Sequence, residues 1–82
     1  MTKPKEEYPE EIKQVLVEIG KRVRQFRRAS EPNYETFAKT HDINKVTLSK
    51  LERGENFRMS TLLQVLKALD ITIDDFFGED IL

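Results

Sequence analysis

Residues 33–54 read NYETFAKTHDINKVTLSKLERG, a pattern that predicts two short helices joined by a tight turn. Asn33 and Asn44 each stand where a helix is expected to begin, and asparagine is a preferred N-cap residue. Between the helices, Asp42 tolerates the positive φ that a tight turn often needs. Gly54 stands where helices often end. The predicted elements are a helix over residues 34–40, a turn over residues 42–44 and a helix over about residues 45–53.

Helical periodicity continues on both sides of this segment. Upstream, apolar residues recur three or four positions apart until Pro32 stops the helix; they are Ile12, Val15, Leu16, Ile19, Val23 and Phe26. Downstream, similar patterns predict a helix over about residues 60–69 and a fifth from about Thr72 to Gly78. The residues expected in the core include Phe37, Ala38, Ile43, Leu48, Leu51 and Leu62. No stretch alternates as a strand does.

The expected fold is therefore all-α, with five helices in one domain. The domain is expected over residues 12–78, between a partly ordered N-terminal tail at residues 1–11 and a short C-terminal tail at residues 79–82.

Composition excludes several classes of protein. The 82 residues contain no cysteine, which excludes disulfides, thiol catalysis and Cys-ligated zinc, and a single histidine, His41, excludes a His-pair metal motif. No apolar run is long enough to cross a membrane. We find no phosphate-binding loop and no plausible acid–base pair, and His41 is expected to end the second helix with its ring at the edge of the core. The chain is expected to be no enzyme, to need no cofactor and to have no membrane partner.

Charge is unevenly distributed along the chain. Residues 12–58 hold eleven basic and six acidic groups, a net charge of +5, whereas residues 1–11 carry −2 and residues 59–82 carry −4. A basic middle between acidic ends is typical of a surface that binds a polyanion, although a solvated surface with random variation gives the same pattern.

The order of these pieces resembles the Cro/CI-type (XRE, lambda-repressor-like) helix-turn-helix family. Residues 33–38 are similar to its second helix, and residues 46–54 to its recognition helix with the glycine stop. The other three similar stretches, in the expected order and spacing, are residues 19–27, 61–69 and 73–77. Three residues depart from the family pattern: Tyr34 replaces a usual glutamine, Asp42 a usual glycine, and His41 a usually aliphatic residue.

The resemblance implies two sets of DNA contacts. By position, the base contacts are Asn44, Lys45, Val46, Ser49 and Lys50. Lysine can donate to guanine O6 and N7, and valine can touch a thymine methyl group. The implied contacts to the DNA backbone are Asn33, Tyr34, Thr47, Arg53, Asn56 and Arg58. Arg27 and Glu52 match a pair that forms an internal salt bridge in relatives, so both are expected to be structural.

The resemblance also implies a partner and a function. Relatives commonly bind palindromes in double-stranded DNA as symmetric dimers. One of Phe76 and Phe77 is expected to close the core, and a homodimer interface is expected at Phe77, Ile81 and Leu82. The implied function is a sequence-specific transcriptional regulator in the cytoplasm, associated with the nucleoid. A phage repressor, a restriction–modification controller and an antitoxin remain open, as does a helical module that acts mainly through a cognate protein partner.

Overall fold

The computed structural model describes residues 9–78, which form five helices and no strand. The helices are α1 (Glu10–Ser30), α2 (Tyr34–Thr40), α3 (Lys45–Glu52), α4 (Met59–Leu69) and α5 (Ile73–Phe77). This confirms the predicted all-α fold and the number and order of its helices. Residues 1–8 of the expected N-terminal tail, and the whole expected C-terminal tail at residues 79–82, lie outside the described residues.

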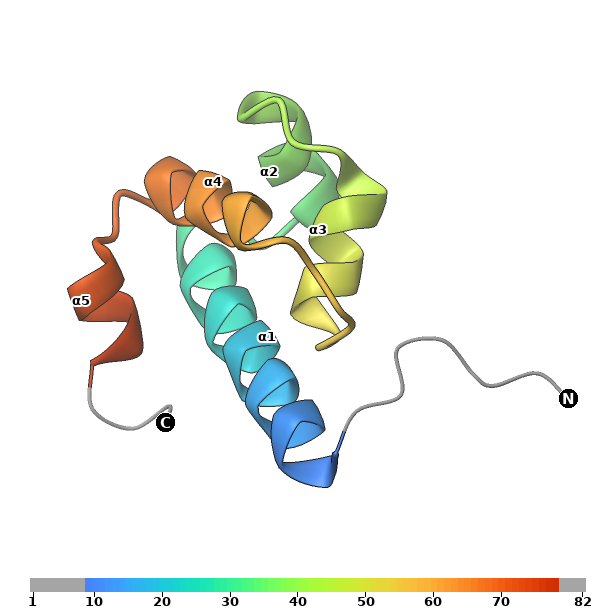
Figure 1. The fold of residues 1–82 in the computed structure, drawn as a ribbon. Coiled ribbons are helices and arrows are strands. Elements are labelled where there is room, and N and C mark those ends of the chain that lie inside the picture. The colour runs from blue at the N-terminus through green and yellow to red at the C-terminus, as the bar shows by residue number, and fades with distance from the viewer. Residues whose placement is uncertain (1–8, 79–82) are drawn as a thin grey trace, which may run out of the picture.

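The long helix α1 lies at the centre of the arrangement (Figure 1). The helices α2 and α3 lie together on one side of it, α5 lies on the other side, and α4 crosses one end. This arrangement places the two short helices at the edge of the molecule, where α3 has one side free of other helices.

The first helix begins at Glu10, two residues before the start that the sequence predicted. Pro9 occupies the N-cap, and proline cannot donate the backbone hydrogen bond that the helix interior requires. Glu10 and Glu11 then lie in the first turn, where negative charge stabilises the helix dipole. At the other end, Glu31 is extended because it precedes Pro32.

One core of eleven buried apolar residues joins all five helices. Its members are Ile19, Val23, Phe37, Ala38, Ile43, Leu48, Leu51, Leu62, Val65, Leu66 and Phe76. The predicted apolar stripe of α1 is buried only in its middle, since Ile12 is 45% exposed and Phe26 is also exposed. A helix of 21 residues is about 30 Å long, and its first turns project past α3 in Figure 1.

Two glycines allow α1 and α3 to approach closely. A Cβ atom on Gly20 of α1 would lie 2.5 Å from the Leu51 carbonyl oxygen and 2.8 Å from that of Glu52. Gly54 has a φ of +80° at the end of α3, and its own Cβ would lie 2.7 Å from Cα of Val17. Backbone therefore packs on backbone here, which fixes the distance between α3 and α1.

Candidate nucleic-acid interface

The helices α2 and α3 are both capped by asparagine side chains. Asn33 Oδ1 accepts a hydrogen bond from the Thr36 amide at 2.9 Å. Asn44 Oδ1 accepts from the amides of Val46 and Thr47 at 2.9 and 3.0 Å. Both carbonyl oxygens thus stabilise helix starts, which leaves the amide NH₂ groups as the donors that could meet another molecule.

The turn between these helices has the predicted strained residue. Asp42 has a φ of 57°, the left-handed region that a turn glycine would occupy more easily. Just beyond it, the Ile43 amide donates to the Ala38 carbonyl oxygen at 2.8 Å, and the Ile43 side chain is buried. His41 is exposed, and its ring lies against that of the buried Phe37, with ring centroids 4.5 Å apart and planes tilted by 47°, so it sits at the edge of the core. These contacts set the angle between α2 and α3.

The helix α3 divides into a buried face and an outer face. Leu48 and Leu51 are fully buried, so the residues that helical geometry places opposite them face solvent. We call these residues the α3 outer face: Lys45, Val46, Ser49, Lys50 and Arg53. Val46 is 56% exposed, although it is apolar and sits in the middle of this face. Ser49 is half-buried, and its hydroxyl accepts a hydrogen bond from Arg53 Nη1 at 3.2 Å.

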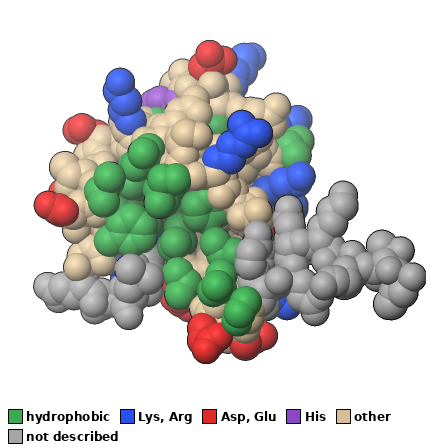
Figure 2. Space-filling model, viewed as in Figure 1, with side chains coloured by type: hydrophobic (Ala, Val, Ile, Leu, Met, Phe, Trp, Pro, Cys, Tyr) green, Lys and Arg blue, Asp and Glu red, His purple; other side chains and the backbone are tan. Residues whose placement is uncertain are grey.

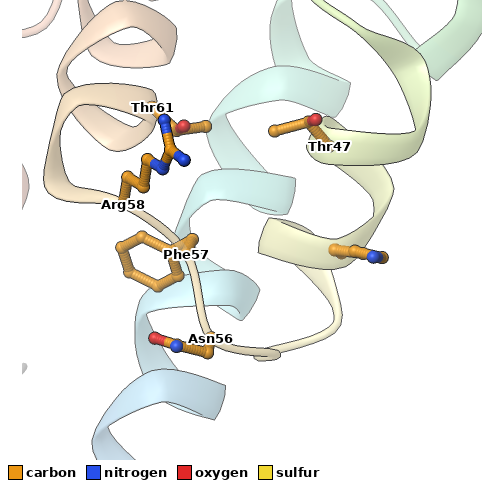
Figure 3. A pocket seen from close by; sticks show the side chains of 6 residues that line it. Thr47, Asn56, Phe57, Arg58 and Thr61 are labelled. Atoms are coloured by element: carbon orange, nitrogen blue, oxygen red, sulfur yellow. The ribbon is translucent and has the colours of Figure 1, made fainter.

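A polar pocket lies on one flank of α3, toward α4. Its lining, which defines the α4-side pocket, is Thr47, Lys50, Asn56, Phe57, Arg58 and Thr61, around about 330 Å³. Figure 3 shows Thr47 and Thr61 pointing toward each other, with Arg58 beside Thr61. The pocket thus combines two cations with hydroxyl and amide groups, which suits an anion such as a phosphate.

A second basic pocket lies on the opposite flank, toward α1. The α1-side pocket encloses about 300 Å³ and is lined by Arg24, Arg27, Tyr34, Ser49, Glu52 and Arg53. Arg53 is bound to Glu55, with Nη2 and Oε2 3.0 Å apart, whereas Arg24 has no ion-pair partner within residues 9–78. The sequence did not predict Arg24 as a site residue, although Arg24 is exposed on the polar face of α1, about one helical turn before the buried Arg27.

The buried ion pair at the back of this pocket joins α1 to α3. Arg27 is 4% exposed, and its Nε and Nη2 donate to the two carboxylate oxygens of Glu52 at 2.8 Å each. Its Nη1 donates to the carbonyl oxygens of Glu31 and Pro32. The hydrogen bond to Glu52 raises the pKa of Arg27, and burial opposes this shift. All three guanidinium nitrogens of Arg27 therefore donate to other atoms of the protein, which gives Arg27 a structural role.

Lys45, on the α3 outer face, and Phe77, in α5, each contact a neighbouring side chain. Lys45 Nζ is 3.2 Å from Oε2 of Glu35, a partner that the sequence did not predict. Phe77 is half-buried and packs edge-on against the fully buried Phe76, with ring centroids 5.1 Å apart. Ile81 and Leu82 lie outside the described residues. Near Phe77, a groove of about 360 Å³ between α4 and α5 is lined in part by Leu63 and Ile73.

Surface chemistry differs between parts of the molecule. Figure 2 shows hydrophobic side chains gathered left of centre and in the lower middle of the visible face, and most of the visible Lys and Arg side chains in its upper and right-hand parts. None of the helices within residues 9–78 has both the length and the apolar character needed to cross a membrane. Within the same residues, no three His, Cys, Asp or Glu side chains gather as metal ligands would.

Two capped helices, a tight turn and an exposed outer face on the second helix define a helix-turn-helix protein. The profile of the Cro/C1-type HTH DNA-binding domain matches residues 22–78, which begins inside α1 and includes the other four helices. The chain belongs to this family of DNA-binding domains, as the resemblance in its sequence predicted.

One curated relative adds to this result. The chain is 38% identical over 69 residues to a Rhodospirillum rubrum protein described as an uncharacterized transcriptional regulator in the ATPase CF(0) region. The match covers 83% of this chain but 64% of that relative, so the chain spans less than two thirds of its length. No solved structure matches the chain.

Proposed function

We propose that this protein is a sequence-specific transcriptional regulator that binds a palindromic operator as a homodimer. The observation behind the proposal is the exposed α3 outer face between two basic pockets. A helix fits the major groove of DNA, with a phosphate backbone on each side. The regulator named among its relatives supports the regulatory part of the proposal. Such a protein would act in the cytoplasm, at the nucleoid.

In this proposal the α3 outer face reads base edges. Lys45 and Lys50 are exposed and can donate to guanine O6 and N7. Val46 is 56% exposed, and an exposed valine in the groove can contact a thymine methyl group. Asn44 can donate from its NH₂ group, since its oxygen caps α3. Ser49 is a weaker candidate, because its hydroxyl already accepts from Arg53.

The two pockets hold the DNA backbone on either side of α3. Arg58, Asn56 and Thr47 would bind a phosphate from the α4-side pocket, and Arg53, Tyr34 and Arg24 would bind one from the α1-side pocket. Asn33 would add its free NH₂ group next to Tyr34. Contacts of this kind set affinity and register and read no sequence.

The homodimer would use the end of the molecule formed by α4 and α5. Ile73 is 50% exposed there, and Leu63 and Phe77 are partly exposed. With Ile81 and Leu82 nearby in sequence, they would give an apolar interface away from α3. Two copies related by a two-fold axis would then place their recognition helices in half-sites about 34 Å apart, one turn of DNA.

The test is a selection of bound duplexes from a random DNA library at near-physiological salt. We expect a palindrome with half-sites about one helical turn apart. Binding that involves about four to six phosphates should weaken with salt, with a log–log slope of about −4 to −5. A folded protein that enriches no sequence would overturn the proposal. The apolar α4–α5 groove would then favour the alternative, a helical module that binds a protein partner.

Single substitutions separate base readers from backbone contacts. Lys45→Ala should lose about 1–3 kcal/mol on the selected operator and relax preference at one base pair. Arg58→Ala and Arg24→Ala should weaken binding to operator and random DNA alike and reduce the salt slope by about 1. Arg28→Ala is the matched control for Arg24, since Arg28 is exposed on α1 and lines neither pocket. Equal losses on both DNAs for Lys45→Ala would contradict its role as a base reader.

A further inference from the structure

An ion pair connects the two helices of the helix-turn-helix on the side that would face DNA. Glu35 is the second residue of α2, Lys45 is the first of α3, and Oε2 and Nζ lie 3.2 Å apart. The two side chains are 56% and 59% exposed, so another molecule can reach both. They also line a pocket of about 340 Å³ between α2 and the start of α3.

The pair presents a donor and an acceptor side by side. A lysine ammonium has three donors, of which Glu35 occupies one, so two remain for DNA. The Glu35 carboxylate has further lone pairs that can accept hydrogen bonds. A free lysine on its flexible stem would bind any nearby acceptor, phosphates included. Glu35 limits this freedom, because it holds Nζ near the first turn of α2.

This arrangement matches the major-groove edge of a G·C base pair best. Guanine offers two adjacent acceptors, O6 and N7, and its partner cytosine offers the N4 amino donor. Because O6 and N4 hydrogen-bond to each other within the pair, they are separated by about 3 Å, as are Lys45 Nζ and Glu35 Oε2. An A·T pair also places an acceptor, thymine O4, beside a donor, adenine N6. It offers Lys45 only one acceptor there, because adenine places the N6 donor beside N7 and thymine places a methyl group beside O4.

We propose that Glu35 and Lys45 together read a G·C base pair, and that Glu35 is a specificity-determining residue of this protein. Lys45 donates to guanine O6 and N7, and Glu35 accepts from cytosine N4 while it holds Lys45 in place. The inference rests on the proposed function, since it requires the start of α3 to enter the major groove.

The test measures discrimination at one base pair of the selected operator. Lys45→Ala first identifies that base pair, as the position where preference is lost. Affinities of the wild type, Glu35→Ala and the double variant are then compared on the operator and on operators with that pair replaced. Glu18→Ala is the matched control: it also removes an exposed, lysine-paired glutamate, but in α1, where Glu18 lies 3.8 Å from Lys21. Thermal unfolding verifies that each variant is folded.

We expect a G·C pair at this position and a loss of its preference by about fivefold or more in Glu35→Ala, the lower end of what a good base contact contributes. Glu18→Ala should leave the preference unchanged. In the Lys45→Ala background, Glu35→Ala should cause a smaller further loss than in the wild type, because only its own contact to cytosine N4 remains to be removed. Another base pair at this position, or an unchanged preference in folded Glu35→Ala, would overturn the inference and leave the proposed function intact. A wild type that selects no sequence would overturn both.

Discussion

Arg27 of α1 joins that helix to α3 and to the connection between α1 and α2. Its guanidinium binds Glu52 of α3 and the two carbonyl oxygens of the α1–α2 connection. The charge is buried but fully engaged, which makes burial tolerable. Glu52 raises the pKa of Arg27, and a raised pKa withdraws stability only when the pH rises through it. Loss of the Arg27 proton should therefore not weaken the fold between neutral and mildly alkaline pH.

Removing the partner of this buried charge should be strongly destabilising. Glu52→Gln replaces the carboxylate with a neutral amide, and breaking a buried ion pair in this way costs about 3–5 kcal/mol. Denaturant unfolding measures the loss. Glu55→Gln is the matched control, because its pair with Arg53 is exposed on both sides and should contribute little. Equal midpoints for the two variants would contradict a structural role for Arg27 and Glu52.

At the level of single helices, Asn44 at the start of α3 caps the helix and lies where we propose that DNA binds, and substitutions can separate these two roles. Asn44→Ala removes the hydrogen bonds to two backbone amides and should lower the free energy of unfolding by about 1 kcal/mol. Asn44→Asp keeps the cap, since aspartate caps equally well, but it adds negative charge where we propose that DNA binds. We therefore expect Asn44→Asp to unfold like the wild type and to bind DNA more weakly.

Chemical unfolding and a DNA titration test both halves of this expectation. Thr72→Asp adds the same charge at the N-cap of α5, where Thr72 Oγ1 accepts from the Asp75 amide, on an element other than the α2–α3 unit. Its effect on DNA binding should be much smaller. Equal weakening by the two aspartates would mean that net charge, and not the position of α3, controls binding.

The packing of α1 on α3 reverses the usual effect of a glycine replacement. Gly→Ala in a helix interior ordinarily stabilises by about 1 kcal/mol. Gly20→Ala would instead force a methyl group against backbone atoms of α3, and we expect a loss of about 1–3 kcal/mol. Gln25→Ala, at an exposed position of the same helix, should change stability by less than about 0.5 kcal/mol. A more stable Gly20→Ala, measured by thermal unfolding, would contradict this packing.

The helices were predictable because their determinants are local. The caps at Asn33 and Asn44, the positive φ of Asp42 and the stop at Gly54 each depend on a few neighbouring residues. Asp70 also has a positive φ, at the end of α4, and its sequence gave no comparable indication.

What the sequence did not show depends on residues that are distant in the chain. The need for Gly20 depends on the carbonyl oxygens of α3, the basic pocket at Arg24 depends on Tyr34 and Arg53, and the ion pair of Lys45 depends on Glu35 in another helix. Ile12 belongs to the predicted apolar stripe but is 45% exposed, because periodicity shows which face of a helix is apolar and not how much of that face its neighbours cover.

For the molecule as a whole, charge is divided along the chain. Residues 12–58, which include α2 and α3, carry a net +5, and residues 59–82, which include α4 and α5, carry −4. An acidic end stays away from phosphates, which favours an approach to DNA with α3 first. It also leaves the apolar residues of α4 and α5 free to meet a second copy.

A charge in that apolar region should separate the proposed dimer. Ile73→Asp places a carboxylate on an exposed side chain, so we expect a folded monomer that binds a half-site but binds the palindrome more weakly than wild type. Light scattering gives the mass, and Phe77→Asp tests the neighbouring half-buried position. Met59→Asp, equally exposed at the other end of α4, should leave the mass unchanged. The interface is wrong if wild type, Ile73→Asp and Phe77→Asp all have the same mass.

The split between the two faces of α3 has a consequence for how such proteins diverge. Leu48 and Leu51 hold the helix in the fold, whereas Lys45, Val46 and Lys50 contribute almost nothing to the core. Exchanges among ordinary helix-forming residues at exposed positions change stability by about 0.5 kcal/mol or less. If these side chains read bases as proposed, descendants of this chain can therefore acquire new DNA sequence preferences through single substitutions without first gaining stability.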